Sequence, residues 1–162
     1  MTDNPDPAHR IFVSYIDKSR DYYAAQGFTN PYRWAYHRDA PFTRLAKPLA
    51  EARVGLITTA SLSPEDPVRP EAFAVPSGPP PPLFTNQRFW DKEATHTDDL
   101  DSFAPVNRLR EAAASGRIAS ASPRLYGIPT EYSQRKTVQS DAPRLLEFLR
   151  EDGVDVALLV PL

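Results

Sequence analysis

The segment from Ser140 to Leu162 constrains the fold more than any other part of the chain. Ser140 can cap a helix, leucines recur at helical spacing after it, and Gly153 can end that helix. The apolar run 154–162 follows at once, and such a run is typical of a strand buried on both faces of a sheet. A helix, a glycine turn and an apolar strand form the second half of a β-α-β unit. The segment therefore predicts an α/β fold with a mostly parallel sheet and flanking helices, of the Rossmann-like, doubly wound class.

Two further patterns support this architecture. The run 54–60 is apolar and β-branched and is closed by a polar loop, which predicts the first core strand. Further along, Ser102 or a neighbour can cap a helix that carries Pro105 in its first turn and ends before Gly116. We also expect a short strand at 118–122.

Prolines and turn residues mark the connecting segments. The stretch 63–82 is rich in proline, with four prolines in a row at 79–82, and cannot form a central strand. We predict a stiff surface connector inserted into the domain, and we keep a ligand for a proline-recognition module as the less favoured alternative. Residues 126–129 have the pattern of a turn, and a polar stretch follows up to Gln139.

Aromatic residues are frequent in the first part of the chain. Apolar residues recur at near-helical spacing between positions 9 and 28, and Gly27 can end that helix. The stretch 29–48 combines aromatic rings with prolines, so we expect an irregular surface segment. The predicted organisation is an N-terminal helical segment, 1–30, followed by an α/β domain, 31–162, that contains the Pro-rich loop.

The composition argues against several classes of function. The chain has 162 residues, no cysteine and a net charge of -2, with its basic residues scattered. We therefore expect no nucleic-acid partner, and the lack of a long apolar run predicts a cytoplasmic protein without a membrane span. Without cysteine, disulfides, cysteine zinc sites and thiol nucleophiles are excluded. No phosphate-binding glycine loop and no nucleophile elbow occur, so we expect no cofactor and no hydrolase triad.

Four segments of the region 31–162 match a family pattern in the right order. They are 47–60, with a Pro-Leu lead and a Val-Gly-Leu-Ile-Thr-Thr-Ala strand, then Asp99-Leu100-Asp101, then 105–111, and finally 153–161, which begins Gly-Val-Asp. Together they resemble the short relatives of the selenoprotein B component of glycine, sarcosine, betaine and D-proline reductases. The chain departs from the family pattern at four places. Asp101 stands where the family has Asn, and Asn107 stands where it has Asp. Ala119 and Ser120 replace a glycine expected after Gly116-Arg117-Ile118, and an aromatic-Met-Gly segment is reduced to Tyr126-Gly127.

The resemblance implies the reductive cleavage of a small substrate. In the family a selenolate or thiolate attacks the substrate, a partner thiol resolves the adduct, and the Sec or Cys pair follows the strand that corresponds to 156–161. This chain has neither residue, so we expect no catalytic residue in it and no activity of the chain alone.

The redox group must then come from elsewhere. Either a UGA codon for selenocysteine is misread as a stop after Leu162, so that the domain is incomplete at its C-terminus, or the chain is a true short subunit or a degenerate paralogue. The alternative function is a non-catalytic substrate-binding or protein-interaction module that kept the fold.

Candidates for substrate binding lie where the strands end, because open α/β sheets bind ligands beyond the carboxyl ends of their strands. Thr58 and Thr59 end the first core strand, and they either face a ligand or simply complete the strand. Arg108 either pairs with a substrate carboxylate or forms a surface salt bridge.

Acidic residues before the second helix are candidates as well. The resemblance matches Asp91, Asp99 and Asp101 to acidic positions of the family. His96 lies among them, but the spacing fits no defined metal site, so a polar loop is the favoured interpretation and we predict no metal.

The terminal strand also bears on partners. If part of the sheet is missing, this strand presents an unpaired edge or an uncovered apolar face, which another chain is expected to cover. We therefore expect a Cys- or Sec-bearing partner chain or a homodimer, beside the small-molecule substrate.

Overall fold

The computed structural model describes residues 14–30, 38–39, 43–64, 71–84, 93, 96–128 and 133–161. The chain forms two compact units, Met1–Pro41 and Phe42–Leu162. In the first unit, α1 spans Tyr15–Ala25, buries none of its residues and ends before Gly27, whose φ of +87° is suited to glycine. The predicted helix and its glycine stop are therefore confirmed for the described residues.

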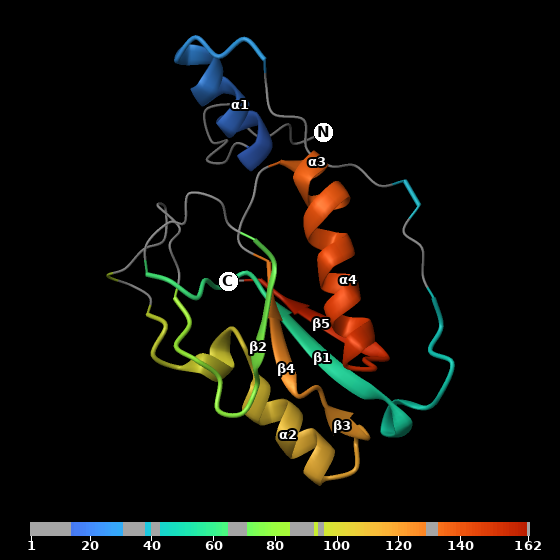
Figure 1. Ribbon diagram of the computed structural model, residues 1–162. Coiled ribbons are helices and arrows are strands. Elements are labelled where there is room, and N and C mark those ends of the chain that lie inside the picture. The colour runs from blue at the N-terminus through green and yellow to red at the C-terminus, as the bar shows by residue number, and fades with distance from the viewer. Residues whose placement is uncertain are drawn as a thin grey trace, which may run out of the picture. The chain divides into compact units, whose positions relative to one another are not determined.

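A mixed five-stranded sheet forms the centre of the second unit (Figure 1). Its strands are β1 (Arg53–Thr58), β2 (Phe73–Pro76), β3 (Ser120–Ala121), β4 (Arg124–Gly127) and β5 (Val156–Val160). β1 is central: β3 and β4 pair with one of its edges and β5 pairs with the other, all in parallel. β2 pairs antiparallel with β4 and forms an outer edge.

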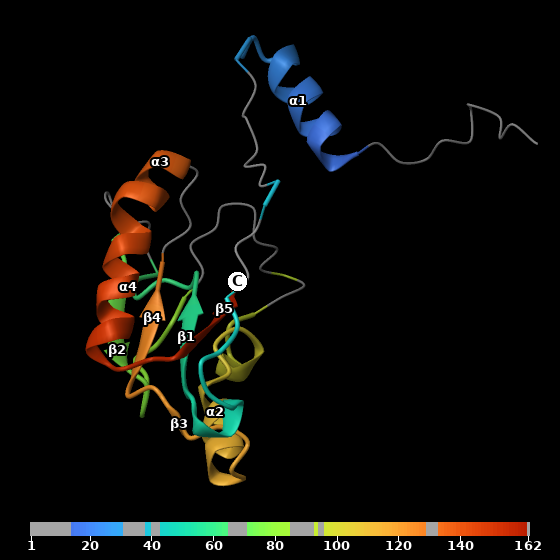
Figure 2. The same ribbon diagram turned by 90° about the vertical axis from the view of Figure 1, so that its right-hand side faces the viewer.

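Helices cover both faces of this sheet (Figure 2). α2 (Val106–Ala114) lies on one side and α4 (Ala142–Glu151) on the other. Because successive residues of a strand point to opposite faces, Leu56 of β1 packs toward α2 and Ile57 packs toward α4. The α/β class, the mostly parallel sheet and the flanking helices are thus confirmed.

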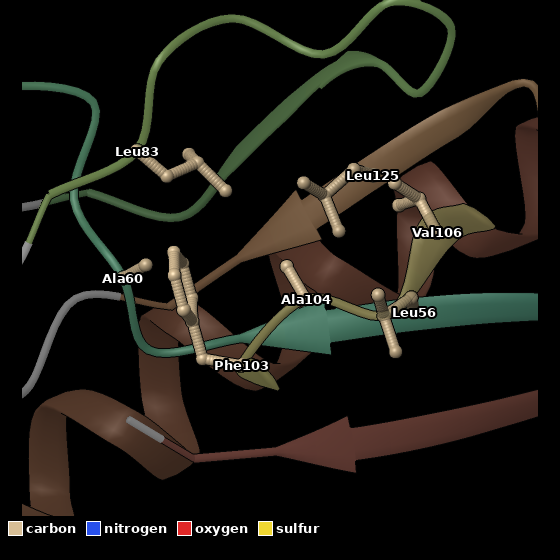
Figure 3. Close-up of a cluster of buried hydrophobic side chains, with 7 residues drawn as sticks. All are labelled: Leu56, Ala60, Leu83, Phe103, Ala104, Val106 and Leu125. Carbon is tan, nitrogen blue, oxygen red and sulfur yellow. The ribbon is translucent and has the colours of Figure 1, made fainter. Parts of the chain in front are cut away.

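Each face of the sheet has its own core. The α2-side core, shown in Figure 3, consists of Leu56, Ala60, Leu83, Phe103, Ala104, Val106 and Leu125. The α4-side core consists of Ile57, Tyr126 and Leu145, with Phe148 and Leu149 packed against it. Gly55 of β1 allows this close packing, since a Cβ there would lie 3.1 Å from side-chain atoms of Leu149, Tyr126 and Val154.

The last helical segment begins earlier than predicted. α3 (Gln134–Lys136) and the π-helical turn η4 (Thr137–Asp141) lead directly into α4. The Ser133 hydroxyl accepts a hydrogen bond from the backbone N–H of Lys136 at 3.2 Å and caps the segment. The start predicted at Ser140 is wrong because two serines in the same polar stretch are both suitable caps.

Two predicted connections contain strands. The Pro-rich stretch 63–82 includes β2, which ends at Pro76, and proline is tolerated there because an outer edge requires fewer backbone donors. The turn predicted at 126–129 begins inside β4, which pairs with both β1 and β2. Tyr126 is fully buried in β4, so pairing and burial outweigh the local turn signal.

β5 is a strand, as predicted, but it is not buried on both faces. Gly153, with a φ of +63°, ends α4 and turns the chain into β5, as predicted. Leu158 is 43% exposed and Leu159 is 74% exposed. Within the described residues β5 has β1 as its single partner strand and forms the second outer edge.

Candidate functional site

The parallel strands β1, β4 and β5 end at the same level. Thr58, the last residue of β1, is in register with Gly127 of β4 and with Val160 of β5. The short 3-10 helix η3 (Leu100–Ser102) and the start of α2 lie at this level too, because the Thr58 hydroxyl contacts the carbonyl of Phe103. We call this region the carboxyl edge, and it is where open α/β sheets bind their ligands.

The two threonines at the end of β1 differ in exposure. Thr58 is 0% exposed, and its Oγ1 donates to the Phe103 carbonyl at 3.4 Å and accepts from the Ala60 N–H at 3.2 Å. This hydroxyl ties the end of β1 to the segment that precedes α2. Thr59 is partly exposed and is the threonine that reaches the surface.

Asp101 caps the N-terminus of α2. Its Oδ1 accepts a hydrogen bond from the backbone N–H of Asn107 at 3.0 Å, and its Oδ2 accepts one from Asn107 Nδ2 at 3.0 Å. Arg108 Nε lies 3.6 Å from Oδ2. A carboxylate is favoured here by the partial positive charge of the helix terminus. The N-cap residue of α2 is Pro105, so the cap position predicted at Ser102 or a neighbour is wrong, and Asp101 supplies the acceptor from outside the cap position.

The contacts of this cap also favour the ionised form of the Asp101 carboxyl. Partial burial raises the pKa of this carboxyl, but the hydrogen bonds from Asn107 and the charge of Arg108 outweigh burial, so its pKa lies below the usual value. Asp99 precedes the cap, and its Oδ1 accepts from the Asp101 N–H at 3.1 Å. Asp99 therefore caps η3, and Asp101 provides the acceptor for the start of α2.

Arg108 faces solvent beside this cap. Its side chain is 64% exposed, and Nη1 donates to Glu111 Oε2 at 2.8 Å. An exposed pair of this kind is weak, and a guanidinium has five N–H donors, so Arg108 retains donors for a ligand carboxylate. The structure thus groups Asp99, Asp101 and Arg108 at the start of α2, while Asp91 lies outside the described residues.

A reciprocal substitution tests this cap. In Asn107→Asp two carboxylates face each other, and we expect the free energy of unfolding to fall by about 1 kcal/mol. Adding Asp101→Asn restores an amide–carboxylate pair with the roles exchanged, so we expect the double variant to regain most of that loss. Urea unfolding measures both effects, and a single variant as stable as the parent would contradict the contact.

A second polar cluster, which the sequence did not predict, lies at the opposite end of the strands from the carboxyl edge. Asp152 Oδ2 accepts hydrogen bonds from Arg124 Nε at 2.6 Å and from the Tyr126 hydroxyl at 2.5 Å. Tyr126 also shares a hydrogen bond of 2.6 Å with Ser122 Oγ, and Arg124 Nη2 donates to Glu151 at 2.8 Å. We call these five residues the amino-edge cluster. Its only sequence signal is an Arg and a Tyr two positions apart, on one face of a strand.

The pKa values of the amino-edge cluster favour a structural role. Burial, together with the hydrogen bond to Asp152, raises the pKa of Tyr126 to about 12. Burial also raises the pKa of Asp152, but hydrogen bonds from Arg124 and Tyr126 lower it by more. A catalytic acid or base needs a pKa near the working pH, and these shifts go the other way. The cluster holds the end of α4 against β4.

Other polar groups add no site within the described residues. No three His, Cys, Asp or Glu side chains there are arranged to hold a metal ion, and His96 lies in an exposed loop with Nδ1 3.5 Å from the Asp98 carboxylate. A small cleft beside α2 is lined partly by Arg110 and Arg124, and the Arg110 guanidinium donates to the Ser77 carbonyl. This cleft lies toward the amino edge, away from the carboxyl edge.

Comparisons with known proteins add no relative. No family model, no curated protein and no solved structure matches the chain. In the part of the chain that the structure describes, no helix has the length and apolar character needed to cross a membrane. The functional interpretation therefore depends on the residues and their geometry.

Proposed function

We propose that this chain is a selenoprotein B-like reductase domain or subunit of the Rossmann-like class, which holds a small substrate at the carboxyl edge. The reactive selenolate or thiolate comes from outside residues 1–162, on a continuation of the chain or on a partner chain. The chalcogen forms a bond to the substrate as the leaving group departs. A second thiolate then attacks the chalcogen and the chalcogen–carbon bond breaks. The carbon keeps the electron pair and takes up a proton, which gives the reduced product, while the two chalcogens are left oxidised as a disulfide or selenenylsulfide.

The register of β5 is the observation that carries this proposal. Val160 at the end of β5 lies beside Thr58 at the end of β1. The segment before α2 lies there as well, because the Thr58 hydroxyl donates to the Phe103 carbonyl. A redox group that follows β5 in sequence, or that a partner brings to this strand, reaches the carboxyl edge. Arg108 at the start of α2 can bind the carboxylate of a substrate there.

Two of the four departures from the family pattern are compatible with the proposal. The family's Asn and Asp are exchanged in this chain as Asp101 and Asn107, and the two side chains hydrogen-bond to each other at 3.0 Å. An exchange of two residue types within one contact keeps an amide paired with a carboxylate. These two departures therefore preserve the interaction.

A second contact joins the first and last matching segments. Lys47 Nζ lies 2.9 Å from Asp155 Oδ1, and Asp155 Oδ2 accepts from the backbone N–H of Arg53 at 2.8 Å. These interactions hold the lead into β1 against the start of β5. The matching segments are thus neighbours in the fold as well as collinear in sequence.

Capture of the native protein tests the source of the redox group. A tagged chain is recovered from its own cells, and alkylation of thiols and selenols followed by mass spectrometry identifies what co-purifies. We expect a Cys- or Sec-bearing chain, or a peptide that continues beyond Leu162. Recovery of neither, together with no readable frame downstream of codon 162, would overturn the proposal.

Arg108 provides the test of the binding edge. With the captured complex and a dithiol reductant, Arg108→Ala is expected to raise KM for a small carboxylate substrate by about tenfold or more, with Arg108→Lys intermediate. Arg144→Ala is the matched control, because Arg144 forms an equivalent exposed pair with Glu147 at 2.7 Å on α4. Equal effects of the two alanine variants would remove Arg108 from the site.

The alternative, a non-catalytic binding module, is favoured by one observation. Thr58, Asp99 and Asp101 are all engaged in hydrogen bonds within the fold. If the captured protein has no Cys- or Sec-bearing partner but the pure chain binds small carboxylates through Arg108 in calorimetry, this alternative replaces the reductase.

A further inference from the structure

The outer edge formed by β5 is both apolar and open among the described residues. β5 pairs with β1 alone, and Leu158 and Leu159 are 43% and 74% exposed. Leu158 lies on the α2 side of the sheet, as Val160 does, whereas Leu159 lies on the α4 side with Ala157. An occupant of this edge must therefore pair with the backbone and cover apolar side chains on both faces.

The two outer edges of the sheet differ in how they prevent association. β2 is short, ends in Pro76 and is followed by the prolines 79–82, which supply no N–H for a neighbouring strand. β5 has no proline and no charged residue from Val156 to Val160. Of the two outer edges in the described part of the sheet, the β5 edge is thus the one suited to accept another strand.

The side to which each residue of β5 directs its backbone N–H and C=O determines which of these groups can bond to another strand. The Val54 carbonyl accepts from the Ser122 N–H and the Thr58 carbonyl accepts from the Ile128 N–H, so these two residues of β1 direct their backbone groups away from β5. Because this direction alternates along a strand, Gly55 and Ile57 face β5 and bond to the residues that flank Ala157 and Leu159, so the backbone N–H and C=O groups of Ala157 and Leu159 point away from β1. The outward groups are therefore spaced symmetrically about Leu158.

We propose that a second copy of this chain pairs with β5 in antiparallel fashion, with a two-fold axis at Leu158. In this register Leu158 lies opposite its counterpart in a non-hydrogen-bonded pair, and Ala157 exchanges hydrogen bonds with Leu159 of the other copy, so each outward N–H and C=O of these residues has a partner. Ala157 then lies opposite Leu159 of the other copy, which places a small side chain against a large one on the α4 side.

The charges around β5 are compatible with this dimer. Asp155 is the nearest charged residue, it lies outside the paired segment, and Lys47 neutralises it at 2.9 Å. A two-fold axis perpendicular to the sheet places both α4 helices on one face. Leu159, 74% exposed, then lies against Ala157 of the other copy on that face, which adds buried apolar area to a strand pairing that would be small on its own.

A charge exchange at Leu158 tests the proposal, which is independent of the proposed function. Light scattering of the full chain is expected to give twice 18.1 kDa. Leu158→Lys and Leu158→Asp should each be monomeric, because like charges face each other across the axis, and an equimolar mixture should return to the dimeric mass. Val138→Lys, at a residue 71% exposed outside β5, is the control and should remain dimeric.

Three results would overturn the proposal. They are a monomeric parent chain, a dimer that persists in both charged variants, and a mixture that stays monomeric although circular dichroism shows both variants folded. Hydrogen exchange adds a local readout: the amides of Ala157 and Leu159 should be protected in the parent and exposed in the monomeric variants. Protection of these amides in a monomer would mean that another part of the same chain covers β5.

Discussion

Replacing Asp152 with alanine is expected to lower the free energy of unfolding by about 3 kcal/mol, which corresponds to roughly 10 °C in melting temperature. Asp152 is the shared acceptor of the amino-edge cluster, and its side chain is 13% exposed. Its loss leaves the buried Tyr126 hydroxyl with Ser122 as its remaining partner and leaves Arg124 with the more exposed Glu151 as its remaining carboxylate partner. Thermal unfolding followed by circular dichroism measures the change.

Glu151→Ala is the matched control for this result. Glu151 also accepts from Arg124, but its side chain is 57% exposed, so we expect a loss below about 1 kcal/mol. Equal losses for the two variants would contradict the assignment of Asp152 as the centre of the cluster.

The same cluster predicts how stability depends on pH. The pKa of Asp152 is lower in the folded chain than in the unfolded chain, so its contribution is complete above the unfolded value of 3.8 and is lost as the pH falls through the folded value. In Asp152→Asn this acid-dependent loss should be smaller than in the parent. Unfolding midpoints measured between neutral pH and pH 3 provide the comparison.

Replacing Gly127 with valine is expected to cost about 3 kcal/mol. Gly127 lies directly opposite Phe73 in the β2–β4 pair, and a Cβ at this glycine would overlap the Phe73 ring. The ring must therefore leave the surface of β4 and lose its packing against the α2-side core. Urea unfolding of the single variant measures the loss.

Removing the ring tests the cause. Phe73→Ala alone should destabilise the chain, but the double variant Gly127→Val with Phe73→Ala should be more stable than the sum of the two losses predicts. Strict additivity would mean that the glycine is needed for a reason other than contact with Phe73.

The elements that the sequence predicted correctly are those with local signals. β1, α2, α4 and β5 each have an apolar pattern and a nearby cap or glycine. Burial was harder to predict, because an apolar run such as 156–160 does not reveal how many strands surround it, and Leu159 is mostly exposed. β4 was missed because its strand character comes from pairing with β1 and β2, which local residue patterns do not record.

The candidate site, like the fold, was predictable from the sequence only where the signals are local. The acidic residues before α2 were found, but their arrangement as a cap depends on Asp101 reaching Asn107 across the turn before α2. The amino-edge cluster was missed because Tyr126 and Asp152 are 26 residues apart and meet only when α4 packs on the sheet. Contacts between distant segments are decided by packing, and a single sequence gives little access to them.

The central position of β1 has a consequence for how the chain folds during synthesis. Arg53 begins β1, but its backbone N–H bonds to Asp155, 102 residues later. One edge of the central strand thus stays open on the ribosome until the residues of β5 have emerged. Contacts this distant in sequence slow folding, so we expect the native sheet to form late. Until then most of the chain is partly folded, and the apolar strand β1 is exposed to aggregation.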